Sequence, residues 1–350
     1  MGVRSLFFRI LIPVALAVFI SLGCTAVPIL GPLPQPATLV PTNTRLPSST
    51  PAPTRTPQTS TLTPTLTLTR TRTVTPSATV TRTPTKTASP RPYPTSSNPV
   101  QICFFAVGLG DAILIIAPDR ETMLIDGGSE GPGITGYLHS LGIHKIDVMV
   151  ATHPHQDHIG GLVDVLGALP VRQLYTNGQS NDSDTTYADF RDAVASSGVK
   201  VTRVVRGNKI HLGELTFDVL NPQASARSDT NENSMVLRFS FRKTTVLLMG
   251  DADHNSESSI LAAGLPVEAD ILKMGHHGSA SSSSEAFLEA VSPSVAIYSS
   301  GYGNSFGLPE KAALDRVRSL GSKIYGTDKN GSIFVPINSN GYKVVASKGE

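Results

Sequence analysis

One stretch constrains what this chain can fold into more than any other: residues 152–161 read Thr-His-Pro-His-Gln-Asp-His-Ile-Gly-Gly. It places three imidazoles and one carboxylate within six residues, directly after the mostly apolar run 146–151. That run is typical of a buried strand, so the stretch is predicted to be a ligand-bearing loop at its end. Four such groups exceed what one tetrahedral ion usually takes from a single loop. The spacing therefore predicts two neighbouring divalent ions, zinc or alternatively manganese, held by His153, His155, Asp157 and His158.

Two later strand ends carry side chains of the same kind. Asp251 closes the apolar run 247–249, and a carboxylate at such a place can bridge two cations. His276 and His277 follow the run 271–274 between two glycines. Neighbouring strand residues point to opposite faces, so the pair diverges unless the glycines re-aim it. We expect one of the two to bind metal, and the other to be a second ligand or the proton donor to a leaving oxygen.

Further polar residues are predicted to support the site. Asp126 ends the run 123–125 and is expected to brace the ligand loop through backbone amides rather than to bind metal. Asn233 belongs to the segment 231–234, which could equally be a polar hairpin turn. The remaining residues expected to support the site or to orient substrate are Asp111, Lys273, Ser279, Tyr302 and Asn304.

The first 24 residues have the features of an export signal. Arg4 and Arg9 precede a short apolar core at 10–22, which is too short for a comfortable membrane span. The segment 21–24 resembles a bacterial lipoprotein processing site, with Cys24 as the lipidated residue. A plain signal peptide and a retained N-terminal anchor remain open. All three place the rest of the chain outside the cytoplasm, on the outer face of the membrane or in the periplasm.

Residues 25–99 are rich in Thr, Pro and Ser, and have too little apolar surface to form a core. We expect a disordered, extended stalk. Nine of the 29 Lys and Arg residues lie in 1–99, where there is no acidic residue. This leaves 20 basic against 27 acidic residues in 100–350, a formal charge of −7. Only the stalk and bound metals are therefore expected to attract an anionic polymer.

Residues 100–350 are long enough for one well-cored domain. Short β-rich apolar runs occur at 102–107, 112–116, 123–125, 147–151, 173–175, 200–205, 216–220, 235–241, 244–249, 271–274, 295–299 and 323–325. Helix-compatible segments lie at 134–141, 187–197, 256–263, 284–291 and 310–320. Two groups of strands with helices between them predict two sheets sandwiched by helices.

Taken together, these residues resemble the metallo-β-lactamase fold superfamily, and within it the ComEC-like domain of bacterial DNA-uptake proteins and its stand-alone relatives. The similar segments are 108–115, 124–128, 152–162, 233–234, 247–251, 269–279 and 325–328. The resemblance implies an α/β (α+β) fold, an αββα sandwich of two mixed sheets flanked by helices, with a dinuclear metal site at its open edge. Ala106, Leu109 and Leu308 stand where this family usually has Asp, Gln and His.

We therefore expect a metal-dependent hydrolase that acts on a phosphodiester, in DNA or in a cell-envelope polymer. Two metal ions would generate hydroxide at neutral pH and stabilise charge on the phosphoryl oxygens. Asp157, His277 and Lys273 are the expected catalytic residues, and the protein is expected to be a monomer. Two alternatives remain: a lactone or β-lactam hydrolase of the same fold, and a non-catalytic surface protein with a structural metal site.

Overall fold

The computed structural model describes residues 99–131, 133–225 and 227–348. The predicted signal peptide with Cys24, and the predicted stalk up to residue 98, lie outside the described residues. Within the part that the structure describes, no helix has the length and apolar character needed to cross a membrane. The described chain enters its first strand at Val100.

The first sheet has the strand order β15-β14-β1-β2-β3-β4-β5-β6, and β16 also pairs with β14. Its strands are antiparallel from β14 to β3 and parallel from β3 to β6. The bounds are β1 Val100–Phe104, β2 Ile113–Ile116, β3 Thr122–Ile125, β4 Val148–Ala151, β5 Gln173–Thr176, β6 Lys200–Arg203, β14 Ile333–Asn338, β15 Gly341–Tyr342 and β16 Val345–Ala346.

The second sheet has the order β13-β12-β11-β10-β9-β8-β7. It is parallel from β10 to β13 and antiparallel from β7 to β10. The bounds are β7 Lys209–Leu212, β8 Leu215–Asn221, β9 Val236–Phe241, β10 Thr244–Leu248, β11 Ile271–Lys273, β12 Val295–Tyr298 and β13 Lys323–Gly326.

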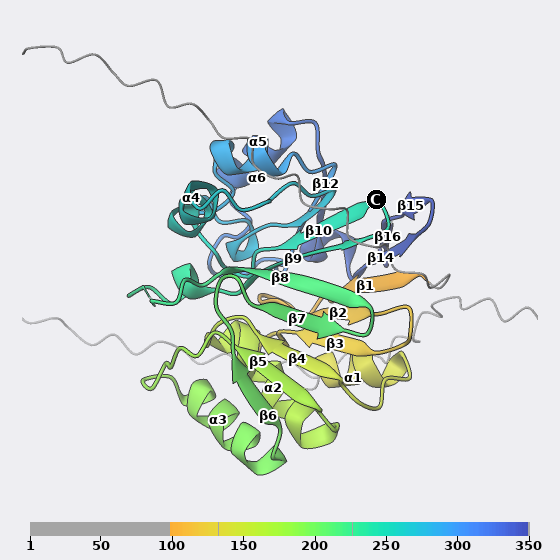
Figure 1. Ribbon diagram of the computed structural model, residues 1–350, viewed down its shortest axis with the longest axis vertical. Coiled ribbons are helices and arrows are strands. Elements are labelled where there is room, and N and C mark those ends of the chain that lie inside the picture. Colours follow the sequence, from red (N-terminus) through yellow and green to blue (C-terminus); the bar gives the residue numbers. More distant parts are fainter. Residues whose placement is uncertain (1–98, 132, 226, 349–350) are drawn as a thin grey trace, which may run out of the picture. The chain divides into compact units, whose positions relative to one another are not determined.

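Helices cover the outer face of each sheet (Figure 1). The helices α1 Gly133–Ser140, α2 Gln156–Ala168 and α3 Thr185–Ser197 pack on the first sheet, and α4 His254–Ala262, α5 Glu285–Val291 and α6 Lys311–Ser319 on the second. Short turns form η1 Asn231–Asn233, η2 His276–Gly278 and α7 Thr327–Asn330.

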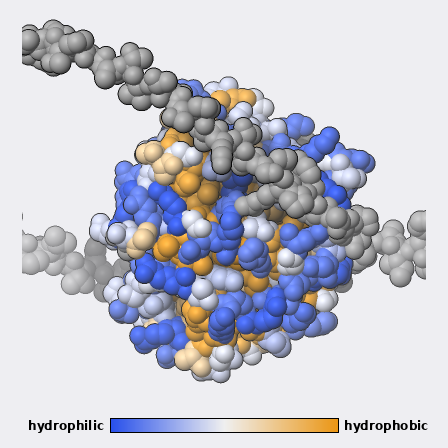
Figure 2. All heavy atoms as spheres, viewed as in Figure 1, coloured by the Kyte–Doolittle hydropathy of each residue, from blue (hydrophilic) through white to orange (hydrophobic). Residues whose placement is uncertain are grey.

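Both faces of each sheet are buried, so the hydrophobic core has three layers: one between the two sheets and one under each group of helices. In β2, Ile113 and Ile115 face the core between the sheets, whereas Leu114 packs under α1 and α2. This alternation explains why the strand reads as a continuous apolar run. On the face drawn in Figure 2, hydrophilic and hydrophobic residues are interspersed. The predicted αββα sandwich of two mixed sheets is confirmed.

Two parts of the fold differ from the sequence-based expectation. Asp157 and His158 lie in the first turn of α2, not in a loop as predicted. The strands β14 to β16 were not predicted either. A proline such as Pro336 disfavours a central strand, because it has no amide hydrogen to donate to a neighbouring strand. In β14 it lies between the residues that pair with β16 and those that pair with β15, where no such donor is required.

Glycines bring helix α2 into backbone contact with the turn after β3. A Cβ on Gly161 would lie 2.1 Å from the carbonyl oxygen of Gly127, and one on Gly160 would lie 2.4 Å from the amide nitrogen of Glu130. The amide of Gly127 donates to the carbonyl of His158 at 2.7 Å. Gly160 and Gly161 therefore lie inside helix α2 and not in a loop. Because they have no side chains, the first turns of the helix can lie against the turn after β3.

This contact predicts opposite effects for two glycines of the same helix. Gly161→Ala should lower the free energy of unfolding by about 1 to 3 kcal/mol, because the new methyl group has no room. Gly167→Ala should raise it by up to ~1 kcal/mol, because nothing lies within 4 Å of the added Cβ and alanine favours the helix. Urea denaturation of the two variants beside the wild type measures both, and a stabilised Gly161→Ala would contradict the contact.

Candidate metal centre

The ligand-type side chains follow the carboxyl ends of parallel strands in both sheets. Asp126 follows β3 and His153 follows β4, which are parallel neighbours in the first sheet. Asp251 follows β10 and His277 follows β11, which are parallel neighbours in the second. The two sheets pack face to face, so these strand ends meet at one edge of the sandwich, where ligand sites of α/β folds usually lie.

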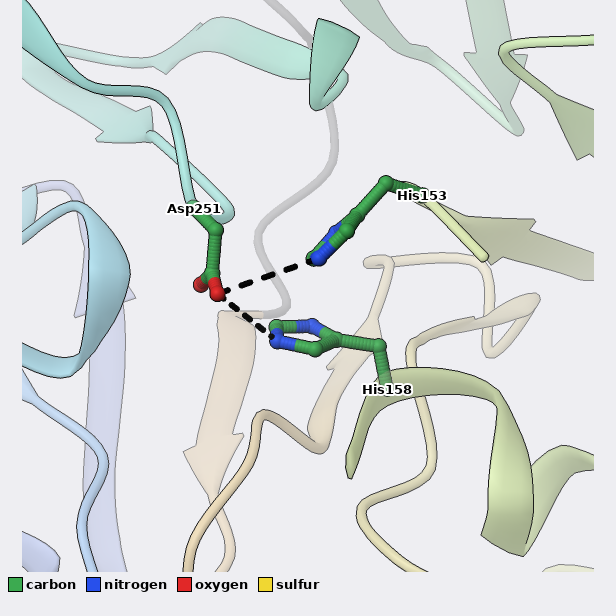
Figure 3. A group of neighbouring side chains, drawn as sticks. All are labelled: His153, His158 and Asp251. Atoms are coloured by element: carbon green, nitrogen blue, oxygen red, sulfur yellow. Dashed lines mark ion pairs between the residues drawn. The ribbon is translucent and has the colours of Figure 1, made fainter. Parts of the chain in front are cut away.

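Asp251 lies at the middle of the cluster. Its Oδ2 atom is 3.3 Å from Nε2 of His158 and 3.3 Å from Nε2 of His277. Nε2 of His153 lies 3.8 Å from the same oxygen. Figure 3 shows the rings of His153 and His158 directing nitrogen atoms at this carboxylate. One carboxylate oxygen thus faces imidazoles that come from both sheets.

Asp157 completes a second group beside the first. Its Oδ2 atom lies 3.2 Å from Nε2 of His277 and 3.9 Å from Nε2 of His158. His155 lies at the other side, with Nδ1 3.0 Å from Nε2 of His153. The ligand atoms form two overlapping groups, His153 with His158 and Asp251, and Asp157 with His158 and His277.

Asp126 holds His158 from the far side of its ring. Its Oδ2 atom is 2.8 Å from Nδ1 of His158 and accepts from the hydroxyl of Thr152 at 2.6 Å. Its Oδ1 atom accepts from the amide of Thr152 at 2.8 Å. Asp126, His158 and Asp111 also form a third group of possible metal ligands. Both oxygens of Asp126, however, are already bonded to Thr152 or His158. Asp126 is therefore placed to orient His158 so that Nε2 faces the cluster.

Sequence reasoning missed three residues that position the ligands. Thr152 bonds Asp126, the hydroxyl of Ser234 accepts from the amide of Asp251 at 3.1 Å, and the carbonyl of Ser299 lies 3.2 Å from Nδ1 of His277. Each is a small polar residue within two positions of a buried strand, and that position was the signal available in the sequence.

The two adjacent histidines take different places. Both have positive φ, 44° for His276 and 54° for His277, so the chain turns sharply after β11. The His277 side chain is buried in the cluster. The His276 side chain is 30% exposed, lies 4.0 Å from Asp251 through Nε2 and also contacts Asn231. His277 is thus a cluster member, and His276 lies at the rim.

Lys273 lies beneath the cluster. Its side chain is fully buried, and Nζ is 2.7 Å from Oδ2 of Asp111 and donates to the carbonyl of Met274. The other oxygen of Asp111 is 3.8 Å from Nδ1 of His277. Lys273 therefore neutralises Asp111 behind His277, and the structure does not bring it to the solvent-exposed side of the site.

The other predicted residues lie outside the group of ligand atoms. The side chain of Asn233 bonds the backbone of Arg227 and Asp229, which folds its own loop. Ser279 donates to Glu310 at 3.1 Å. Tyr302 and Asn304 belong to the loop after β12, where Tyr302 is exposed and Asn304 bonds the loop backbone.

The members of the cluster shift one another's pKa values. Burial lowers the pKa of His158, but nearby carboxylates, Asp251 foremost, raise it well above the usual 6.5. Burial also lowers the pKa of His277, but Asp251 and Asp157 raise it to about 9. Burial and the charge of His158 lower the pKa of His153 well below 6.5. Two imidazoles of the metal-free cluster therefore carry protons at neutral pH, and a third does not.

The donor set fits divalent cations. Oδ1 of Asp251 is buried and has no hydrogen-bond partner among the described residues, an arrangement that costs free energy unless a positive charge compensates it. Imidazole nitrogens and carboxylate oxygens are common ligands of zinc, and manganese also accepts them. His158 and His277, which come from the two sheets, lie 3.3 Å from the other oxygen of this carboxylate, Oδ2. Before a cation binds, the protonated rings of His158 and His277 balance the charge of Asp251, and a pair of cations would take the place of those protons.

Comparisons with known proteins agree with this geometry. The family model described as "Metallo-beta-lactamase superfamily" matches residues 106–302, which contain the whole cluster. The chain is 29% identical over 260 residues to ComE operon protein 3 of Bacillus subtilis (strain 168), covering 69% of this chain and 33% of that protein. It is 30% identical over 257 residues to Competence protein ComA of Neisseria gonorrhoeae, covering 72% and 34%. The chain thus spans about a third of the length of these relatives.

Among solved structures, the metallo-beta-lactamase fold protein YhfI from Bacillus subtilis is similar, with a TM-score of 0.47 and 13% sequence identity. The similarity covers 65% of this chain and 96% of that one.

The buried Lys273–Asp111 pair predicts a large loss of stability when one partner is removed. Lys273→Met should lower the free energy of unfolding by about 3 to 5 kcal/mol, because it leaves a buried carboxylate without its cation. The double variant Asp111→Leu/Lys273→Met should recover most of this loss. The exposed pair Lys311–Asp315 serves as the control, and Lys311→Met should cost less than about 1 kcal/mol. Equal unfolding midpoints in urea for Lys273→Met and wild type would refute this assignment.

The raised pKa values predict that metal binding releases protons. Because His158 and His277 hold protons at neutral pH, a cation must displace them. The apparent affinity for manganese should therefore rise between pH 7 and pH 9, by about tenfold per pH unit for each displaced proton. Calorimetric titration in two buffers with different ionisation heats counts the protons. His277→Gln should release fewer, and heats that do not depend on the buffer would rule the prediction out.

Proposed function

The chain belongs to the metallo-beta-lactamase superfamily, and from the arrangement of its ligands we propose that it is a dinuclear metal-dependent hydrolase that cleaves phosphodiesters. One observation carries the proposal. Oδ2 of Asp251 lies 3.3 Å from both His158, which the two ligand groups share, and His277, which belongs to the second group. Asp251 would therefore help to hold the cations of such a site.

The residues around Asp251 form two sets, one for each proposed cation. His153, His155 and Asp251 would hold one cation, and Asp157, His158 and His277 the other. Cations held by these residues would supply hydroxide at neutral pH and would stabilise charge on the phosphoryl oxygens. His276 remains partly exposed at the rim, where its imidazole can give a proton to the leaving oxygen. Asp126 and Ser299 keep the rings of His158 and His277 in orientation.

We propose DNA as the substrate, with a cell-envelope phosphodiester as the alternative. The names of two relatives, ComE operon protein 3 and Competence protein ComA, connect those proteins with competence. The domain itself carries more acidic than basic residues. Attraction of a polyanion would therefore depend on the bound cations and on the basic residues of 1–99.

The N-terminal sequence supports export and tethering. We propose that the chain is exported and held at the outer face of the membrane through lipidated Cys24, and that it works as a monomer with zinc or manganese. The support is the charged start with Arg4 and Arg9, the apolar core at 10–22 and the Gly-Cys pair at its end.

A cavity beside the cluster supports a second candidate function. It has a volume of about 210 Å³, adjoins His153 and is lined in part by Leu174, Tyr187, Phe190 and Val194. Such a lining would accept an acyl group, as hydrolysis of a lactone or β-lactam requires. The fold alone does not decide between the two reactions.

Turnover of a simple diester tests the proposal. The full-length chain, loaded with zinc or manganese, should hydrolyse bis-p-nitrophenyl phosphate, and Asp251→Ala should lower kcat by roughly 100-fold or more. Asp315→Ala, which removes an exposed carboxylate on α6, is the matched control and should retain full turnover. Circular dichroism of each variant checks that the fold is kept.

Three results would count against the proposed reaction. Undiminished turnover in Asp251→Ala would show that the cluster is not the active site. No diester turnover with either metal, together with hydrolysis of a lactone, would favour the second candidate. Loss of thermal stability on metal removal, without turnover of any substrate, would indicate a structural metal site.

A further inference from the structure

The loop 301–309, between β12 and α6, exposes two aromatic rings to solvent. Tyr302 is 90% exposed and Phe306 is 72% exposed, more than any other large hydrophobic residue among those that the structure describes. Single exposed apolar side chains are common on protein surfaces. Two exposed rings on one short loop indicate a binding surface for a partner with an apolar face.

The loop is held in shape by one side chain. Oδ1 of Asn304 accepts from the amides of Phe306 and Leu308, both at 3.1 Å. Its Nδ2 donates to the hydroxyl of Ser300 at 3.1 Å and to the carbonyls of Gly301 and Leu308. The rings are therefore presented by an ordered backbone, and binding a ligand there would cost little loop entropy.

The first end of the loop is tied to the metal centre. The carbonyl of Ser299 lies 3.2 Å from Nδ1 of His277, and the next residue, Ser300, is bonded through its amide to Thr327. A Cβ on Gly301 would lie 2.9 Å from the amide nitrogen of Leu109, so the loop begins in close backbone contact with the turn before β2.

The second end is tied to the same site. The amide of Glu310 donates to the carbonyl of Gly278 at 3.0 Å. Its carboxylate accepts from the amide of Ala280 at 2.8 Å and from the hydroxyl of Ser279. Both ends of the loop thus bond the segment 276–280 that contributes His277, so the loop that carries the rings is anchored to the metal centre at both ends.

We propose that Tyr302 and Phe306 form a stacking platform for the bases of single-stranded nucleic acid beside the metal centre. The inference rests on the proposed phosphodiesterase function and names its substrate class. Every base has a π-face, and each base stacked on an aromatic side chain typically contributes about 5- to 150-fold in affinity, whatever the sequence. A glycerol phosphate polymer of the cell envelope has no such face.

The charges of the loop favour bases over an anionic membrane surface. Residues 301–309 contain no Lys or Arg, and the next residue is Glu310. Binding to anionic lipid depends on basic residues near the apolar ones. A nucleic acid needs none on this loop if its phosphate lies at the metal centre and its bases lie on the rings.

The chain contains no tryptophan, so one substitution creates a reporter that is specific for this loop. Tyr302→Trp in the full-length chain is titrated with a 12-mer of thymidylate, an abasic 12-mer, poly(glycerol phosphate) and vesicles of anionic lipid. Each titration is run with manganese, which keeps a phosphate contact at the metal centre, and is repeated with chelator, where the outcome does not depend on whether the chain hydrolyses diesters. A difference between the thymidylate and abasic 12-mers in either condition counts as stacking. Leu141→Trp is the control, an exposed position after α1 on the other helical layer.

The expected result is quenching of Tyr302→Trp emission by the thymidylate 12-mer and not by the abasic 12-mer or poly(glycerol phosphate). Leu141→Trp should show no such difference. The double variant Tyr302→Ala/Phe306→Ala should bind the thymidylate 12-mer about 5-fold to 150-fold more weakly per lost ring, measured by fluorescence anisotropy. Tyr302→Phe keeps the ring and should retain the affinity.

Three outcomes would overturn the proposal. Equal responses to the thymidylate and abasic 12-mers would mean that only phosphates are recognised. A blue shift with vesicles and no quenching by the 12-mer would assign the loop to a membrane surface. Unchanged affinity for the thymidylate 12-mer in the double alanine variant would exclude the rings from binding.

Discussion

The metal-ligand cluster depends on one backbone contact, between helix α2 and the turn after strand β3. Glycines at 127 and 161 let the two main chains approach without side chains between them, and the amide of Gly127 bonds the carbonyl of His158. This contact fixes where the helix begins, and therefore where its first turn presents Asp157 and His158. His158 can then bond Asp126 through one ring nitrogen and face Asp251 with the other.

Three buried carboxylates around the centre differ in how their charge is compensated, and this difference separates their roles. Asp111 is paired with the ammonium group of Lys273. Asp126 accepts from Thr152 and contacts His158, so the chain itself satisfies it. Asp251 faces only imidazoles. Asp111 and Asp251 each have one oxygen without a hydrogen-bond partner among the described residues, but only Asp111 has a lysine beside it. The charge of Asp251 is therefore balanced by protons on His158 and His277, and unlike the ammonium group of Lys273 these protons can be replaced by a cation.

The sequence predicted the sandwich and the ligand-type residues because both leave local patterns. Short apolar runs mark strands, and the spacing at 153–158 marks a metal site. What it could not predict depends on partners distant in the chain. The start of α2 requires the turn at Gly127. The segment β14 forms a strand despite Pro336 because it pairs with β1. The choice between His276 and His277 depends on backbone dihedrals and on Ser299, which follows the neighbouring strand β12.

The charge of the domain limits how it could hold a polyanion. Residues 100–350 carry 27 acidic and 20 basic residues, so a diffuse attraction between Lys or Arg and phosphates is weak in this part of the chain. Two local features can replace it under the proposed function. Cations at Asp251 would take one phosphate, and the rings of Tyr302 and Phe306 would take uncharged bases. Binding of this kind selects a strand whose bases are free to leave a duplex stack, because paired bases have no face to offer the loop.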